Sequence, residues 1–324
     1  MLDELRGKNG LIIHHWDADG ICSAALLLQR LGEQVANKTP ILGNYLLTED
    51  ELKAYAGYDF IIVADMALPE DNITRLSASS QVLIFDHHLQ SPIPGIFHEN
   101  PMSRGESPEK YPSASWIINT YLGNPVNLYA LLGIVGDHEE RIQSNKSFGS
   151  IFYTFCMQHQ VTFKELLAMV YLLDSNYKIG DRRAVIEAPR FLLQNKDPRG
   201  ILDCQPWKKN LVTLEKEITK WVNAPGEEKN GVCVKAISTS FNIISTVTRK
   251  IFWSTKKDTV VVNTGFFKEA DQIYVRSVRN LEPLIQQGKT LGLKCGGKTE
   301  VMGAVVPKEK TQSFLDIILA FLEV

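Results

Sequence analysis

Three apolar stretches in the first part of the chain share one pattern, in which β-branched or aromatic residues lead directly into carboxylates or imidazoles. They are "GLIIHHWDADG" (10–20), "DFIIVADMALP" (59–69) and "QVLIFDHH" (81–88). Short continuous apolar runs are typical of central parallel strands, which are buried on both faces. The pattern therefore predicts three parallel strands with polar carboxyl ends.

Helical patterns separate these strands. Residues 21–32 end on Gly32, which suits a helix C-cap, and residues 68–79 carry a proline near their start, where a first helical turn tolerates it. The alternation predicts an α/β fold with a doubly wound, mostly parallel sheet. Ligands of such sheets bind outside the carboxyl ends of the strands, where the polar residues lie.

The pattern changes further along the chain. A fourth apolar run, "NLYALLGIVGDHEE" (127–140), leads to Asp137, which we expect at the same polar edge, and residues 148–195 have a mostly helical pattern. After "NKDPRG" (195–200), a helical stretch precedes several strand-like segments and a closing helix. A chain of 324 residues is long for one compact core.

We therefore predict an N-terminal catalytic domain over 1–195, a connecting linker and helix over 196–227, and a smaller α/β substrate-binding domain over 228–324.

Composition narrows the class of protein and the compartment in which we expect it. An apolar fraction of 44% and a charged fraction of 22% are those of an ordinary globular protein. The formal charge of -2 means that a nucleic-acid partner would be held by a local basic patch. The five cysteines form no C-x-x-C pair, which indicates free thiols in a reducing compartment. With no signal peptide or membrane-length apolar run in sight, we expect a cytoplasmic protein without membrane contact.

The polar strand ends share metal-binding chemistry. They comprise His15, Asp17, Asp19, Asp65, Asp86, His87, His88 and Asp137. Gathered carboxylates repel one another unless cations neutralise them, and oxygen ligands mixed with imidazole suit Mn²⁺ or Mg²⁺. Two such ions about 3.5–4 Å apart clamp the oxygens of phosphoryl transfer, and Asp65 is the most plausible bridging ligand. Taken singly, each aspartate could equally be a helix N-cap.

Four motifs carry a family resemblance. "HHWDADGICSA", "VADMA", "FDHH" and "GIVGDHE" resemble, in the same order, the motifs of the DHH phosphoesterase superfamily. That superfamily includes RecJ-type single-strand exonucleases, nanoRNA and cyclic-dinucleotide phosphodiesterases, and manganese-dependent inorganic pyrophosphatases. The resemblance covers residues 10–140 strongly and 228–310 more weakly.

The resemblance implies roles by position. The implied ligands of two Mn²⁺ ions, with Mg²⁺ as an alternative, are His15, Asp17, Asp19, Asp65, His87 and Asp137. Asp65 would serve both ions, and His15 is the least certain ligand because branches of the superfamily differ there. Asp86 would orient the metal-binding imidazole, and His88 would contact the scissile phosphate or transfer a proton.

The second half resembles the DHH-associated domain. "IYVRSVRN" (273–280) matches its arginine-bearing strand and "GLKCGGKTEVMGAVV" (292–306) its glycine-rich loop. The implied substrate-binding residues are Arg276, Gly296, Gly297 and Lys298. Lysine stands where the family has histidine, so this position offers a point charge without a stacking ring. The alternative is a hairpin turn with a solvated lysine. Phe252 and Trp253 could stack a base, but core packing is the favoured interpretation.

These observations favour a divalent-metal-dependent exonuclease acting on single-stranded DNA or RNA. The first alternative is a phosphodiesterase for nanoRNA, other oligonucleotides or cyclic dinucleotides. An inorganic pyrophosphatase and a helicase- or replication-associated subunit rank lower, although an active nuclease that docks on a helicase or repair partner would look the same in sequence. The oligomeric state stays open.

Overall fold

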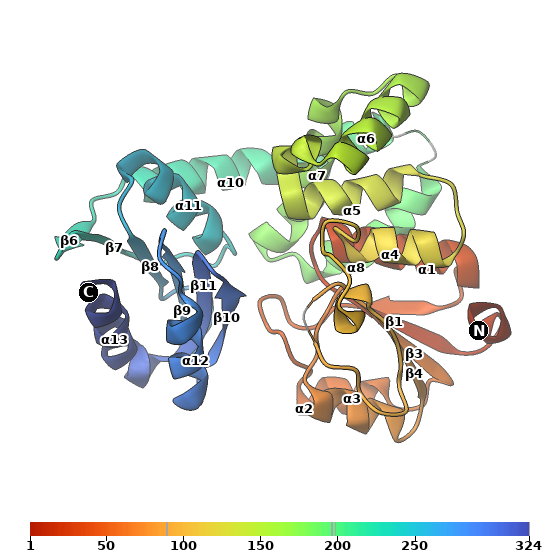
Figure 1. Ribbon diagram of the computed structural model, residues 1–324, viewed down its shortest axis with the longest axis horizontal. Coiled ribbons are helices and arrows are strands. Elements are labelled where there is room, and N and C mark those ends of the chain that lie inside the picture. The colour runs from red at the N-terminus through yellow and green to blue at the C-terminus, as the bar shows by residue number, and fades with distance from the viewer. Residues whose placement is uncertain (89, 196, 198, 324) are drawn as a thin grey trace. The chain divides into compact units, whose positions relative to one another are not determined.

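The computed structural model describes residues 1–88, 90–195, 197 and 199–323, without the side chains of Arg199 and Lys298. The chain forms two compact units (Figure 1). Unit 1 comprises Met1–Tyr177 and Asp181–Leu211, and unit 2 comprises Lys178–Gly180 and Val212–Val324. In the described chain, no helix combines the length and the apolar character that crossing a membrane requires.

Unit 1 is built on a five-stranded sheet in the order β2-β1-β3-β4-β5. Its strands are β1 (Gly10–His14), β2 (Ala36–Lys38), β3 (Phe60–Ala64), β4 (Gln81–Phe85) and β5 (Phe97–Glu99). All four described strand pairings are parallel. The predicted parallel strands are therefore confirmed. β2 and β5 escaped prediction because three residues are too few to show a period.

Helices cover both faces of this sheet, as a doubly wound fold requires. Alternate strand residues, such as Ile12 and Ile62, pack with α1 (Ala18–Leu31) and α4 (Ala114–Tyr121). Their neighbours Leu11 and Ile61 pack with α2 (Glu49–Tyr55) and α3 (Glu70–Ser77) on the other face. Each strand thus needs apolar residues at every position, which explains the continuous runs in the sequence.

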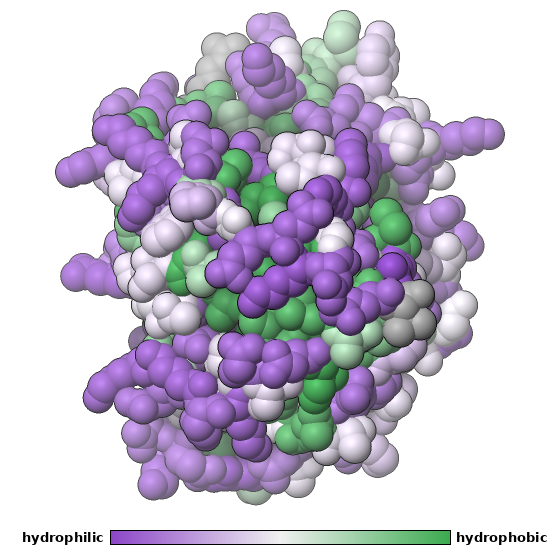
Figure 2. Space-filling view, turned by 90° about the vertical axis from the view of Figure 1, so that its left-hand side faces the viewer, coloured by the Kyte–Doolittle hydropathy of each residue, from purple (hydrophilic) through white to green (hydrophobic). Residues whose placement is uncertain are grey.

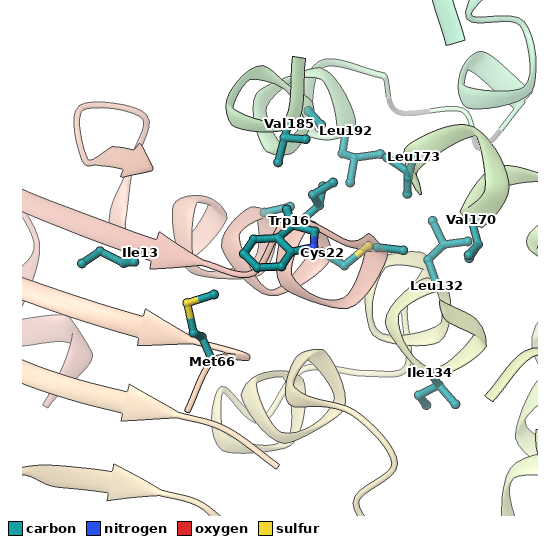
Figure 3. Close-up of a cluster of buried hydrophobic side chains, with 14 of the residues drawn as sticks. Ile13, Trp16, Cys22, Met66, Leu132, Ile134, Val170, Leu173, Val185 and Leu192 are labelled. Carbon is teal, nitrogen blue, oxygen red and sulfur yellow. The ribbon is translucent and has the colours of Figure 1, made fainter. Parts of the chain in front are cut away.

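Further helices surround α1. They are α5 (Leu128–His138), α6 (Lys146–His159), α7 (Phe163–Ile179) and α8 (Arg182–Gln194). Figure 3 shows Leu132 of α5, Val170 and Leu173 of α7, and Val185 and Leu192 of α8 gathered around Cys22 of α1. The fourth apolar run is therefore a helix, and Asp137 comes from a helix end instead of a strand end.

The remaining elements of this half are short or lead into unit 2. They are the 3-10 helices η1 (Leu2–Leu5), η2 (Pro101–Arg104) and η3 (Glu139–Ser144), and the helices α9 (Arg199–Leu202) and α10 (Gln205–Asn223). The sequence predicts a connecting segment over 196–227, and α9 and α10 lie within this stretch.

Unit 2 is built on a six-stranded mixed sheet in the order β10-β11-β9-β8-β7-β6. The strands are β6 (Glu227–Lys229), β7 (Val232–Ile237), β8 (Thr259–Asn263), β9 (Ala270–Arg276), β10 (Lys294–Lys298) and β11 (Val301–Pro307). β7 and β8 pair in parallel and the other described pairs are antiparallel. The predicted α/β fold of this half is thus confirmed.

The two faces of the second sheet have separate cores. On one face lie α12 (Glu282–Thr290) and α13 (Thr311–Glu323), and Phe314 of α13 packs on Val260 and Ile273. The short 3-10 helix η4 (Lys308–Lys310) leads directly into α13. On the other face, α11 (Ile244–Thr255) packs on Val261. Figure 2 shows the side of the molecule where β6 and α13 lie, with hydrophobic side chains surrounded and crossed by hydrophilic ones.

The segment compared with a glycine-rich loop is not a loop. Residues 294–307 form the hairpin of β10 and β11, which is the alternative that the sequence had left open. Met302, Ala304 and Val306 are buried on the α13 side, whereas the residues between them are partly exposed. This alternation is a strand period, and the glycines among the strand residues had hidden it.

Candidate metal centre

The ends of β1, β3 and β4 lie at one edge of the first sheet, and their polar side chains converge there. Asp65 lies between two imidazoles: its Oδ2 is 3.8 Å from His15 Nδ1 and its Oδ1 is 3.4 Å from His87 Nε2. His15 Nδ1 also lies 2.8 Å from Asp17 Oδ2, and His87 Nε2 lies 3.2 Å from Asp137 Oδ2. Residues far apart in sequence thus form one cluster.

Three overlapping groups in this cluster have the geometry of metal sites. Within each group, one potential ligand atom per residue lies within 4.8 Å of the others. The groups are His15 with Asp17 and Asp65, Asp65 with His87 and His88, and Asp19 with His87 and Asp137. Asp65 and His87 each occur in two groups, so the cluster has room for more than one cation with shared ligands.

The backbone at Asp65 is unusual. Its φ of 57° lies in the left-handed region, and its amide donates to the carbonyl oxygen of Phe85 at 2.9 Å. Among non-glycine residues, aspartate and asparagine adopt this conformation most readily. The turn directs a nearly fully buried carboxylate into the cluster, and local strain of this kind gathers at functional sites.

The electrostatics of the cluster call for cations. Burial raises the pKa of Asp65 well above its ordinary value, and the charges of Asp19, Asp17 and Asp137 raise it further. For Asp17, burial also opposes ionisation, but the adjacent His15 outweighs it and holds the pKa below its usual range. Several buried carboxylates this close together stay ionised only when positive charge balances them.

Two of the aspartates also hold the local backbone. Asp17 Oδ1 accepts from the Gly20 amide at 3.2 Å and thereby caps α1, while its Oδ2 faces His15. The buried Asp19 accepts from the amides of Ala114 at 2.7 Å and Ser115 at 2.9 Å, at the start of α4. An ionised carboxylate has about four lone-pair positions, so both residues keep capacity for a cation. The capping and metal interpretations are therefore compatible.

Asp86 differs from its expected role. Its Oδ1 accepts from the amide of His87 at 2.8 Å and lies 2.7 Å from Nδ1 of His88, so it orients the imidazole of His88. Burial alone would lower the pKa of His88, but the Asp86 carboxylate outweighs it and raises the pKa to about 9.

His14 confirms the expectation of a core residue. It is fully buried, and its Nδ1 lies 2.7 Å from the carbonyl oxygen of His15. Burial lowers the pKa of His14 to about 4. It points away from the cluster that its neighbour joins.

Glycines in the fourth motif bring α5 against α1. A Cβ on Gly133 would lie 2.0 Å from Ser115 Oγ and 2.2 Å from Asp19 Oδ1. A Cβ on Gly136 would meet the Ala18 Cβ at 3.2 Å. Because neither side chain is present, α5 comes close enough for Asp137 to reach His87.

Sequence reasoning missed Asp174. This buried residue of α7 accepts from the Ala18 amide at 3.0 Å, so it fixes the backbone between Asp17 and Asp19. A single carboxylate inside the apolar run "VYLLDSN" was the available signal. The tyrosine ring of Tyr45 was missed as well; its centroid lies 6.0 Å from that of His15.

The predicted substrate-binding residues lie in unit 2. The guanidinium carbon of Arg276, at the end of β9, is 5.6 Å from the ring centroid of Phe252 and 5.7 Å from that of Trp253. Gly296 pairs with Gly303 across the β10–β11 hairpin, and Gly297 with Met302.

Lys298 is the last residue of β10, and its side chain lies outside the described part of the structure. The prediction that Trp253 packs in the core is wrong, because half of this side chain is exposed.

Comparisons with known proteins agree with the fold. Neither a protein-family model nor a curated protein sequence matches the chain. Among solved structures, RecJ from Thermus thermophilus in complex with Mn²⁺ is similar, with a TM-score of 0.73 and 18% identity over 99% of this chain and 53% of that one. An exonuclease RecJ bound to manganese gives a TM-score of 0.68 and 16% identity over 99% and 92% of the two chains.

A third similar structure is PggH from Vibrio cholerae, described as a pGpG-specific phosphodiesterase. Its TM-score is 0.53 with 14% identity, over 97% of this chain and 99% of that one. The predicted resemblance to DHH proteins is thus confirmed as a structural likeness over nearly the whole chain. This chain spans about half the length of the first structure, at 53%.

Proposed function

We propose that the chain is a divalent-metal-dependent phosphodiesterase that removes nucleotides from an end of single-stranded DNA or RNA. The observation that carries the proposal is the convergence of carboxylates and imidazoles around Asp65, which lies between His15 and His87. Mn²⁺ is the preferred cation and Mg²⁺ the alternative, since both favour oxygen ligands and tolerate imidazole.

The residues divide into two ligand sets. His15, Asp17 and Asp65 would hold one ion, and Asp19, His87 and Asp137 the other, with Asp65 shared. Bound cations would neutralise the carboxylates and polarise the phosphoryl oxygens. Asp174 and the two glycines of α5 support this arrangement by fixing the backbone that carries the ligands.

His88 is placed to act on the substrate. Its ring is about half exposed, with 49% of the side chain accessible, while its Nδ1 faces the buried Asp86. This pairing keeps the imidazole positively charged, so that its other nitrogen can donate to a phosphate oxygen or to the leaving oxygen. The ring therefore supplies the positive charge and the proton that cleavage of a phosphodiester needs.

Unit 2 would bind part of the nucleic acid through its own residues. Among the described residues, Arg276 has no acidic partner, and a guanidinium binds phosphate through paired N–H donors. Gly296, Gly297 and Lys298 lie on the neighbouring hairpin, where absent side chains let backbone amides approach a ligand. These four residues are the proposed substrate-binding set.

The proposal is tested with end-labelled single-stranded DNA and RNA of several lengths, incubated with Mn²⁺ and resolved by product size. Wild type should give ladders of single-nucleotide steps, and Asp65→Asn should abolish cleavage. Asparagine is the suitable replacement because it tolerates the left-handed backbone at this position. Asp71→Asn, which removes an exposed carboxylate of α3, is the matched control and should cleave normally. Full activity in Asp65→Asn would refute the assignment.

A second candidate keeps the chemistry and shortens the substrate to oligonucleotides or a cyclic dinucleotide. The similarity to PggH favours it, because the two chains cover each other almost completely. The same digestion separates the candidates. Activity confined to fragments of a few nucleotides, with long strands untouched, would support the shorter substrate.

A further inference from the structure

Trp253 occupies a place that the core of unit 2 does not use. The residues of α11 that face the sheet are Ile244, Val247 and Ile251, at helical spacing, and all are buried. Trp253 lies off this stripe, and 50% of its side chain is exposed. A single exposed aromatic residue needs no explanation on its own. Its surroundings make this one unusual.

Two guanidinium groups lie against the indole. The guanidinium carbon of Arg249, one helical turn earlier, is 5.3 Å from the ring centroid, and that of Arg276 is 5.7 Å away. Both distances lie within the range of cation–π attraction, about 6 Å. The pairing fixes an aromatic surface next to positive charge, the combination that single-stranded nucleic acids require.

Arg276 has no acidic partner to neutralise it in the described structure. Its Nε is buried and lacks a hydrogen-bond partner, while the residue as a whole is half-buried. Burying an unpaired donor costs free energy, so the rings of Phe252 and Trp253 must hold the guanidinium in place. The part of the side chain that solvent reaches keeps a positive charge that a phosphate group could neutralise.

The sheet next to Arg276 offers free space. Gly303 of β11 pairs with Tyr274, and Gly296 of β10 pairs with Gly303, so two glycines follow the tyrosine across the strands. A Cβ on Gly296 would meet nothing within 4 Å, and one on Gly303 would only touch the Tyr274 ring at 3.6 Å. The Tyr274 ring therefore covers Gly303, and the space above Gly296 is open to part of a ligand.

We propose that Trp253, Arg249 and Arg276 bind one nucleotide unit, with the indole stacked on its base and Arg276 on the adjacent phosphate. This inference rests on the proposed function and narrows its substrate class. A stacking surface selects ligands that carry unpaired bases, because bases inside a duplex cannot reach it. Pyrophosphate and other base-free polyphosphates would gain nothing from the indole.

The test measures binding to the full chain in EDTA, so that no hydrolysis occurs. Three probes are compared by fluorescence anisotropy or competition: a labelled ten-residue oligothymidylate, a labelled abasic strand of the same length, and tripolyphosphate as competitor. Trp253→Ala should weaken oligothymidylate binding about 5- to 100-fold, the range for loss of one base–aromatic stack. It should leave abasic binding nearly unchanged. Arg276→Met should weaken the oligothymidylate and the abasic strand together.

Two further variants serve as controls. Trp253→Phe keeps a stacking ring and should retain most of the oligothymidylate affinity. Tyr153→Ala removes another highly exposed aromatic residue, on α6, and should bind like wild type. Because every variant keeps the same acidic cluster, affinity ratios between variants report on unit 2.

Three results would overturn the inference: no oligothymidylate binding by wild type, unchanged affinity in Trp253→Ala, or an equal loss for the abasic strand. Hydrolysis is measured separately with Mn²⁺. Base-dependent binding without hydrolysis would refute the proposed function and leave the nucleotide site standing, whereas hydrolysis without base-dependent binding would do the reverse.

Discussion

The two sheets of this protein carry opposite charges at their strand ends. The edge of the first sheet gathers buried carboxylates around Asp65, which are stable in ionised form only with added positive charge. The second sheet ends in Arg276, a guanidinium without an acidic partner in the described structure, stacked against aromatic rings. One region needs cations for its carboxylates, and the other carries a positive charge that no carboxylate in the described chain neutralises.

A second contrast lies within unit 2. The Nζ of Lys235 donates to the carbonyl oxygens of Trp221, Val222 and Ala224, so it caps the end of α10 and is fully engaged. Arg276 has no comparable contacts in the described chain. Partnering thus separates a structural cation from one that is available to a ligand, a distinction that charge counts in the sequence do not reveal.

Gly133→Ala should affect both the stability of the protein and its metal centre. The new Cβ would sit 2.0 Å from Ser115 Oγ and 2.2 Å from Asp19 Oδ1, so α5 must move away from α1. Overpacking of a core costs about 1–3 kcal/mol or more. This exceeds the roughly 1 kcal/mol that alanine gains over glycine in a helix. Denaturant unfolding should show a net loss of stability, together with weaker Mn²⁺ binding.

Gly136→Ala is the matched control for that variant. Its tightest contact would be with the Ala18 Cβ at 3.2 Å, while the Asp19 amide and Val170 would lie at ordinary contact distances, so a small adjustment absorbs it and helix propensity offsets the cost. Its stability should stay within about 1 kcal/mol of wild type. Equal effects of the two substitutions would contradict the close approach of α5 to Asp19.

Lys235→Met should also lower stability. It removes three hydrogen bonds from a charged donor and leaves the carbonyl groups at the end of α10 unpaired, at a cost of about 2 kcal/mol or more. Arg276→Met should cost little stability and should weaken nucleic-acid binding instead. Thermal unfolding and oligonucleotide titration on both variants check this. A large loss of stability in Arg276→Met, or weaker oligonucleotide binding in Lys235→Met, would contradict the different roles given to the two side chains.

Asp174→Ala should have a smaller effect on stability, with a consequence for the metal centre. The Ala18 amide loses its acceptor, which costs about 1–3 kcal/mol for a buried donor and loosens the backbone between Asp17 and Asp19. The apparent Mn²⁺ concentration for half-maximal activity should rise. Asp174→Asn keeps an acceptor oxygen and should restore most of the wild-type response. An unchanged metal dependence in Asp174→Ala would show that the contact is only structural.

Sequence patterns predicted the first region better than the second, for a physical reason. Central parallel strands are apolar at every position, so Asp65 and His87 stand out where such runs end. In the β10–β11 hairpin only alternate residues are buried, and glycines interrupt this alternation, so the sequence of the segment resembled that of a loop. Asp137 lies in the predicted cluster, but it comes from the end of a helix. Gly133 and Gly136 allow that helix, α5, to lie close to α1.

Contacts between distant residues could not be predicted from the sequence. Asp86 was expected to orient the imidazole of His87, but its carboxylate pairs with His88. Asp174 lies 156 positions after the amide that it accepts from, and nothing local marks that contact. The exposure of Trp253 depends on which residues of α11 the sheet covers, which only the packed structure defines.

The most direct measurement is the stoichiometry of Mn²⁺ binding to the full chain by isothermal titration calorimetry. Wild type should bind two ions per chain, and Asp65→Asn, which removes the shared carboxylate charge, should lose at least one of them while staying folded. Failure of wild type to bind Mn²⁺, or the same stoichiometry and affinity in both proteins, would contradict the account of the cluster as a metal centre.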